Sequence, residues 1–331
     1  MTAQTTTNDD PSGTRRPLAV ARLASVAAAA FTLPLLFVGG SVTTYRVGLA
    51  VPDWPTTFGI NMFLFDFINA PFGVQVEHTH RLYGAAVGLA TIAVLLALWI
   101  GDRRRWMKGL GVVALVAVII QGVLGGMRVT RASTLLAAVH GSFGQAFFAL
   151  MVAIAALSSA AWVDAPSPRP DLGRLRRWTT LNFALVYLQI AVGAWFRHFG
   201  DPRGLGLHVA LAVVVLVEAL LLARRILLRR DESRALVPAA RILAAAVVAQ
   251  VVLGVVSLIL LLPLDGVPHA VSAWQALART AHQTNGAVLL AASTVLALRA
   301  RRAFAAVPRV ASEQSHPLEF ATSGTRTEAV A

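Results

Sequence analysis

The stretch THRLYGAAVGLATIAVLLALWI, residues 79–100, decides the class of fold. After Arg81 it carries no charged side chain, and it is long enough to cross a bilayer core as an α-helix, which takes about 20 apolar residues. Similar apolar runs recur along the chain, at about residues 19–41, 108–128, 135–161, 178–197, 205–228, 237–262 and 280–298. The sequence therefore predicts an all-α polytopic membrane protein with eight transmembrane helices.

The composition agrees with a surface that faces lipid. Hydrophobic residues make up 56% of the 331 residues, charged residues only 14%, and the mean hydropathy is +0.67. Soluble domains carry roughly 25% charged residues, so two ordinary soluble domains are excluded. The chain has no cysteine, which excludes disulfides, thiolate metal sites, iron–sulfur clusters and cysteine nucleophiles.

The net charge of +13 is best explained by how basic residues are distributed between the two sides of a membrane. When the predicted spans are threaded through a membrane, 22 Lys and Arg residues fall on one side and 7 on the other. Basic residues favour the cytoplasmic side. We therefore expect a multi-pass protein of the cytoplasmic membrane with both termini in the cytoplasm. The excess charge gives no reason to expect a nucleic-acid partner.

A weak internal repeat divides the chain. QGVLGGMR (Gln121–Arg128) precedes the helix of His140, QIAVGAWFR (Gln189–Arg197) precedes that of His208, and QVVLG (Gln250–Gly254) precedes that of His282. The first hairpin fits loosely, with Gly39-Gly40 before a long loop and then His80. Duplicated hairpins of this kind predict two tandem four-helix bundles. The expected parts are an N-terminal tail 1–18, an N-terminal half 19–161, a linker 162–177, a C-terminal half 178–302 and a disordered tail 303–331, with the tails and the linker in the cytoplasm.

The histidines carry most of the chemical information. His80, His140, His208 and His282 fall in alternate predicted spans, each near the outer end and hence at similar depth. Polar side chains at membrane depth are costly and point to function. Facing imidazoles in a helical bundle can clamp a planar iron macrocycle, although zinc or copper would also accept them. Small residues near these histidines leave room for a large flat ligand, which favours haem. The expected pairs are His80 with His140 and His208 with His282.

Charged residues near the outer ends complete the candidate site. Haem propionates need cationic partners, and we assign Arg81 and Arg128 to the first histidine pair and Arg197 to the second. The alternative is that such arginines extend to the lipid headgroups. Glu77 shares a helix face with His80 and can pair with Arg81. It is a candidate for proton transfer or charge stabilisation, or else a helix-end carboxylate favoured by the dipole. The C-terminal half has no matching acid, so the halves are expected to differ in function.

Several stretches together resemble a known family. They are GGSVTTYR (Gly39–Arg46), GLAVPDWP (Gly48–Pro55), Glu77-x-x-His80-Arg81 and the helices of the three later histidines. Over about residues 20–300 the chain resembles the haem A synthase family of cytochrome oxidase assembly factors. Many bacterial members carry a cysteine pair in the outer loops, and this chain has none.

The resemblance implies an oxidoreductase that converts haem O to haem A by oxidising a ring methyl group to a formyl group through successive hydroxylations. Haem O would bind between His80 and His140, with Glu77 assisting catalysis. Haem b would be the resident cofactor, between His208 and His282. Haem O synthase would act upstream, and the product would pass to cytochrome oxidase and its assembly proteins.

Two other functions remain open at the level of sequence. A bis-histidine dihaem electron carrier would share every ligand prediction but leave Glu77 idle. A haem-handling transporter would share the repeat. No role is assigned to four further residues, namely His78, His198, Glu218 and His269.

Overall fold

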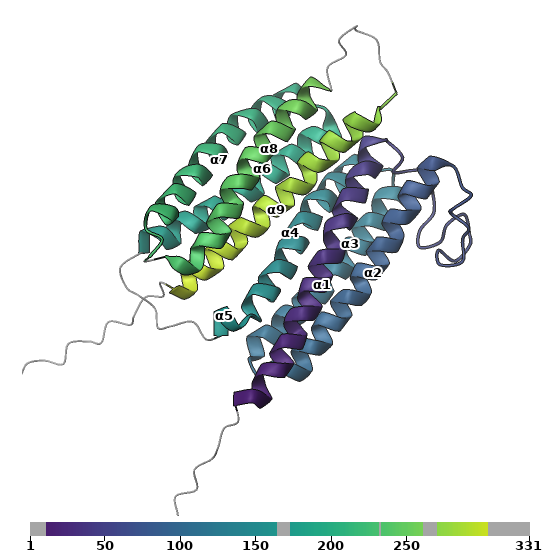
Figure 1. The fold of residues 1–331 in the computed structure, drawn as a ribbon. Coiled ribbons are helices and arrows are strands. Elements are labelled where there is room, and N and C mark those ends of the chain that lie inside the picture. The colour runs from purple at the N-terminus through teal and green to yellow at the C-terminus, as the bar shows by residue number, and fades with distance from the viewer. Residues whose placement is uncertain (1–10, 164–172, 232, 261–269, 304–331) are drawn as a thin grey trace, which may run out of the picture.

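The computed structural model of the chain describes residues 11–163, 173–231, 233–260 and 270–303. These residues are almost entirely helical (Figure 1). The long helices are α1 (Pro11–Thr44), α2 (Phe72–Gly101), α3 (Arg105–Thr130), α4 (Thr134–Leu157), α6 (Gly173–Phe199), α7 (Pro202–Leu228), α8 (Val237–Ile259) and α9 (Ala273–Ala303). Two short elements, α5 (Ala160–Val163) and the 3₁₀ turn η2 (Arg234–Leu236), lie between them.

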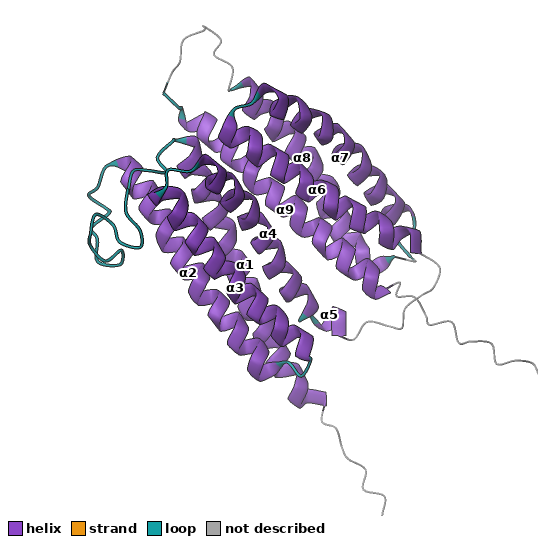
Figure 2. Ribbon diagram, turned by 180° about the vertical axis from the view of Figure 1, so that it is seen from behind, coloured by secondary structure: helices purple, strands orange, loops and turns teal. Residues whose placement is uncertain are grey.

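The long helices pack in two groups with the same cyclic order. In the N-terminal group α1 packs against α2 and α4, and α3 packs against the same two helices. In the C-terminal group α6 packs against α7 and α9, and α8 packs against the same two. Figure 2 shows the two groups from behind, with α4, α6 and α9 in the middle. The groups meet where α9 contacts α1 and α4, and where α6 contacts α4.

The outward-facing surface is apolar, as a lipid-facing surface has to be. Large apolar side chains such as Leu89 and Ile100 are 68% and 85% exposed. Seven of the described helices, namely α1 from Leu18, α2, α3, α4, α6, α7 and α8, are long and apolar enough to cross a membrane. The prediction of an all-helical multi-pass membrane protein is thus confirmed. The eighth predicted span corresponds to α9, which is not among the seven.

Several buried hydroxyl groups are satisfied within their own helices. Ser25, Thr32 and Thr91 each donate to the carbonyl oxygen four residues earlier, at 2.7–2.8 Å. This local bonding pairs these hydroxyls inside the helix, where an unpaired polar group is costly. Among the described residues, the hydroxyls of Ser158, Ser257 and Thr280 have no such partner. Apolar side chains fill the centre of each group, and a smaller cluster around Leu36 and Phe148 lies between the groups.

Short turns set the depth of the histidines. Ser133 caps α4 by accepting a hydrogen bond from Leu136 N–H, and Asp201 caps α7 in the same way from Arg203 N–H. The turn before α7 needs Gly200 at a φ of 67°. His80, His140, His208 and His282 then lie roughly 9–14 Å along their helices from the first residue. The four histidines therefore lie within about one helical turn of the same level.

Helix boundaries differ from the predicted spans mainly at the arginine-rich ends. α1 already begins at Pro11, inside the predicted tail 1–18, and α6 begins at Gly173, inside the predicted linker 162–177. Arginine side chains can reach the headgroups from such extensions, so a helix need not stop at the edge of the apolar run. α4 ends earlier, at Leu157, where Ser158 forms the C-cap. The predicted tail 303–331 lies outside the described residues, apart from its first residue.

Candidate functional site

The structure brings the four histidines together in the two pairs expected from the sequence. The ring centroids of His80 on α2 and His140 on α4 are 6.2 Å apart, with the rings at 89°. The centroids of His208 on α7 and His282 on α9 are also 6.2 Å apart, with the rings at 81°. Each helical group thus holds one pair, and the two pairs have nearly the same geometry.

This spacing fits one metal ion between two imidazoles. A ligating nitrogen lies about 2.0 Å from the metal and about 1.1 Å from its own ring centre, so two such rings in line have centroids about 6.2 Å apart. Among the described residues no group of three or more His, Asp or Glu side chains could hold a metal ion. Structural zinc sites use four protein ligands. A pair of imidazoles suits haem, in which the macrocycle supplies the remaining nitrogens.

The glutamines of the internal repeat make hydrogen-bond contacts with the histidine residues. Gln189 donates to the backbone oxygen of His208 at 2.9 Å, and Gln121 donates to that of His140 at 3.3 Å. The amide nitrogen of Gln250 lies 3.3 Å from Nε2 of His282, whose Nδ1 is 3.1 Å from the backbone oxygen of Gln250. These contacts tie the start of each histidine helix to the preceding helix. Such outer contacts fix the orientation of metal ligands.

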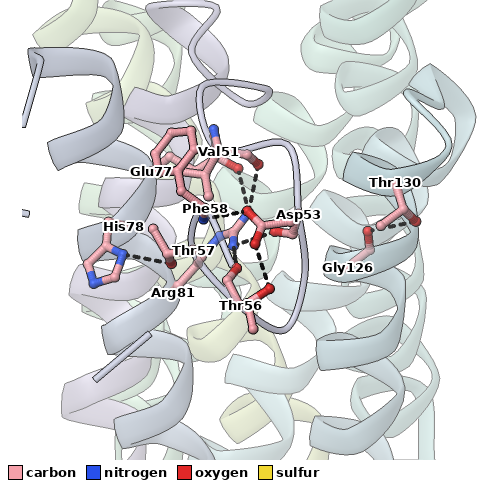
Figure 3. A network of polar contacts seen from close by, with 10 residues as sticks. All are labelled: Val51, Asp53, Thr56, Thr57, Phe58, Glu77, His78, Arg81, Gly126 and Thr130. Atoms are coloured by element: carbon pink, nitrogen blue, oxygen red, sulfur yellow. Dashed lines mark hydrogen bonds and ion pairs between the residues drawn. The ribbon is translucent and has the colours of Figure 1, made fainter. Parts of the chain in front are cut away.

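Glu77 and Arg81 bind the long loop between α1 and α2 (Figure 3). Glu77 is buried and accepts a hydrogen bond from Val51 N–H at 3.0 Å. The predicted ion pair between Glu77 and Arg81 is present, at 3.3 Å. Arg81 also donates to the backbone oxygens of Val51, Asp53 and Thr56 at 2.7–2.9 Å. Its guanidinium therefore holds the loop, and its predicted contact with substrate stays a prediction.

Asp53 stabilises the turn whose carbonyl oxygens accept hydrogen bonds from Arg81. Its carboxylate accepts hydrogen bonds from the hydroxyl of Thr56 and from the backbone N–H groups of Phe58 and Gly59. Desolvation alone would raise the pKa of Asp53, but these hydrogen bonds outweigh it and lower the pKa from 3.8 to about 2. The next residue, Trp54, lays its indole ring against Gly126 of α3. The PDWP motif thus fastens the loop to α2 and α3.

Arg128 lies beside the first histidine pair. Its guanidinium contacts Gly48 in the loop. It is also close enough to Glu77, His80 and His140 to interact with each electrostatically. Arg81 is also near Glu77 and His80, but Arg128 is near both imidazoles of the pair.

Arg197 connects the two helical groups. It donates to the backbone oxygen of Gly40 at 2.7 Å and to the hydroxyl of Thr44 at 2.6 Å, both on α1. A longer bond of 3.4 Å reaches the backbone oxygen of Arg279 on α9. Its buried Nε atom has no hydrogen-bond partner in the described structure. Arg197 is also near enough to His282 to affect it electrostatically.

The structure shows what surrounds His198 and His78, two histidines to which no role was assigned from the sequence. His198, at the end of α6, faces Gly141 of α4 and interacts electrostatically with Arg128 and His140. Only its position next to Arg197 could have signalled this. His78 is fully buried, lies 3.2 Å from the hydroxyl of Thr57, and stacks on Phe67.

Two further residues are simpler to place. Glu218 accepts a hydrogen bond from Asn182 at 2.5 Å, deep in the C-terminal group and away from the histidine pairs. His269 lies outside the described residues.

The sequence model of the COX15-CtaA family, described as cytochrome oxidase assembly protein, matches residues 22–201. The chain belongs to this family. The family acts in cytochrome oxidase assembly and haem A synthesis. No curated protein matches the chain. The match includes the loop network, Glu77 and the first histidine pair, whereas His208 and His282 lie beyond it, so their assignment depends on the repeated geometry.

Asp53→Asn should loosen the loop. The neutral amide is a weaker acceptor, so the backbone amides of Phe58 and Gly59 should exchange hydrogen several-fold faster than in the unaltered protein. Because the pKa of Asp53 is lowered from 3.8 to about 2, its carboxylate should protect the loop fully above pH 3.8 and lose this effect as the pH falls towards 2. Hydrogen exchange followed by mass spectrometry measures both effects.

Asp66→Asn is the matched control, since Asp66 lies in the same loop and its carboxylate accepts a hydrogen bond from the Asn69 side chain rather than from the amides of Phe58 and Gly59. It should leave Phe58 and Gly59 unchanged. Equal exchange in the two variants would contradict the structural role of Asp53.

Proposed function

We propose that the chain is a haem A synthase, an oxidoreductase that converts the ring methyl group of haem O to the formyl group of haem A. The N-terminal group would bind haem O between His80 and His140. The C-terminal group would hold haem b between His208 and His282 as a resident cofactor. Haem O synthase would supply the substrate, and the product would pass to cytochrome oxidase through its assembly proteins.

One observation carries the proposal. Two histidine pairs of equal spacing lie at one level, but only the first has a buried carboxylate three residues away. Duplicated haem sites without different tasks would need no such difference. The family match covers this first pair together with Glu77, which supports its assignment to substrate.

The residues around the first pair can position a substrate and keep water away. Arg128 offers a cation for a propionate group, next to the imidazoles. The loop bound by Arg81 lies over the outer end of α2, and Trp54 closes it against α3. Excluding water strengthens the electrostatic effect of every charge inside the site.

Glu77 is the candidate catalytic residue. Its carboxylate is buried and interacts with Arg128, which is itself close to His80. In this position it can accept a proton or stabilise positive charge that develops on the substrate. The haem iron supplies the redox chemistry when haem is bound, and the methyl-to-formyl oxidation also requires an oxygen source and an electron acceptor.

The arrangement in the membrane is part of the proposal. We infer that α9 is an eighth span, completing two tandem four-helix bundles. Its polar residues face protein, as in the hydrogen bonds from Asn285 to the backbone oxygen of Ala246 at 2.9 Å and to the side chain of Gln250 at 2.7 Å. Polar groups paired in this way are tolerated at membrane depth. The 22 to 7 distribution of basic residues supports cytoplasmic termini and a location in the cytoplasmic membrane.

A dihaem electron carrier is the second candidate. The near-identical geometry of the two pairs favours it, as does the use of both Glu77 oxygens in holding the loop and Arg81. The two functions share their haem ligands and differ in whether haem O is altered.

Pigment analysis decides between these functions. After co-expression with haem O synthase, membranes containing the chain should yield haem A. Glu77→Gln should abolish haem A formation and leave haem b bound, because the amide keeps an acceptor for Val51 N–H but loses the charge. Haem b with unaltered haem O in the unchanged protein would favour the electron carrier.

Arg81→Leu separates catalysis by Glu77 from its contacts with the loop. This variant releases the loop but retains the carboxylate. It should increase hydrogen exchange in residues 51–59, whereas Glu77→Gln should leave that exchange near normal. If both variants lost haem A and loop protection to the same degree, Glu77 would have only a structural role.

His208→Ala and His282→Ala should each deplete haem b, since either change leaves one imidazole at the second site. Quantifying haem b in the purified protein, with helical content as a check on folding, measures the loss. A folded variant with full haem b content would contradict the cofactor site.

The cysteine-free sequence permits a clean test of topology. In intact cells a membrane-impermeant maleimide should label Arg203→Cys and Ala270→Cys, whereas Arg103→Cys and Arg301→Cys should need permeabilised cells. All four positions are exposed. The reverse pattern would contradict the orientation, and labelling of both Ala270→Cys and Arg301→Cys from one side would contradict the eighth span.

A further inference from the structure

Each of the four paired histidines rests against a glycine of the preceding helix. A Cβ atom built on Gly39, Gly125, Gly193 or Gly254 would lie 2.8, 3.2, 2.7 and 3.0 Å from the Cε1 atom of His80, His140, His208 and His282, in that order. In all four cases the next atoms are Nδ1 and then Nε2 of the same ring. The same edge of the imidazole therefore faces the glycine each time.

Ordinary close packing of helices does not explain this pattern. Where glycine serves general packing, a built Cβ meets assorted neighbours, as Gly111 meets Leu95 and Leu98. Other helical glycines, including Gly84, Gly122 and Gly206, have open space in the same direction. At the four histidine positions, all of the three nearest atoms belong to the imidazole ring.

A backbone carbonyl approaches each ring from the same helix. It belongs to the residue four positions before the glycine, which places it on the same helix face. The carbonyl of Gln250 lies 3.1 Å from Nδ1 of His282. The corresponding carbonyls of Leu35, Gln121 and Gln189 are near enough to His80, His140 and His208 to affect them electrostatically. In the described structure, however, Nδ1 of His80 and Nδ1 of His140 make no hydrogen bond. In all four rings Cε1 and Nδ1 are the atoms nearest the glycine, so Nε2 is the nitrogen turned away from it and towards a ligand. At His208 and His282 the side-chain nitrogens of Gln189 and Gln250 lie 3.5 and 3.3 Å from Nε2 and would move aside for that ligand.

We propose that Gly39, Gly125, Gly193 and Gly254 are positioning residues that orient the four histidines for ligation. Without a Cβ, the preceding helix admits the edge of the imidazole and holds the ring at one angle. The first hairpin, which matches the repeat only loosely in sequence and has Leu35 where the others have glutamine, shares this contact. The identification of the ligand as haem rests on the proposed function, whereas the orienting role of the glycines does not.

The contacts also predict an order of effects. Real Cβ atoms essentially never lie closer than 3.0 Å to another heavy atom, so alanine at Gly39 or Gly193 has to displace the ring. At Gly125, with 3.2 Å, a shift of a few tenths of an ångström suffices. Gly39→Ala should therefore disturb the first pair more than Gly125→Ala, and Gly193→Ala should disturb the second pair more than Gly254→Ala.

The test uses the full-length protein purified with its haem. Gly193→Ala should weaken haem retention by about tenfold or more, the loss typical when an outer contact of a metal ligand is removed. The low-spin optical spectrum expected of two imidazole ligands should also be altered. Gly206→Ala, two residues from His208, is the matched control and should leave both readouts unchanged. Gly39→Ala and Gly122→Ala form the corresponding pair for the first site.

Folding is checked separately, by helical content and by gel filtration. If Gly193→Ala fails to fold, the milder Gly125→Ala and Gly254→Ala still test the inference through their spectra. Normal haem retention and spectra in the folded glycine variants, or equal losses in the controls, would overturn it. If the unaltered protein makes no haem A but the glycine variants change its haem spectrum, the proposed function fails and the role of the glycines stands.

Discussion

An imidazole at membrane depth must find its partners within the protein, because the surrounding lipid offers none. An unsatisfied buried polar group costs about 1–3 kcal/mol, and this chain places four such rings at one level. The preceding helix provides a glycine beside each ring, a glutamine in three hairpins and, at His282, a carbonyl 3.1 Å from Nδ1. The glycine beside each ring lets the preceding helix come close enough to meet it.

The outer loop obeys a related constraint. Its backbone polar groups lie next to the membrane and need partners. The single side chain of Arg81 donates hydrogen bonds to three of its carbonyl oxygens. Glu77 neutralises Arg81 and binds a loop N–H group of its own. The Glu77–Arg81 ion pair therefore holds the loop and also lies beside the first histidine pair. A change in loop position would alter the charge environment next to His80.

Local features of the fold could be predicted from the sequence, whereas contacts between distant segments could not. Apolar runs and the fixed rise of a helix place His80, His140, His208 and His282 at one depth, and the structure pairs them as expected. The three loop carbonyls bound by Arg81 lie 25 to 30 residues away in sequence, and no local pattern signals them. The low hydropathy of α9 likewise reflects polar residues paired with other helices.

The bond from Arg197 to α1 has a consequence for how the two repeats have diverged. Arg128, near the matching point of the first repeat, contacts Gly48 of its own group and lies near His198 of the other group. Arg197 instead crosses to the carbonyl of Gly40 and the hydroxyl of Thr44. A guanidinium shared in this way makes the second repeat incomplete by itself. A C-terminal group separated from α1 would lose the carbonyl of Gly40 and the hydroxyl of Thr44 as acceptors for a buried guanidinium, so we expect the two groups to be stable only when packed together.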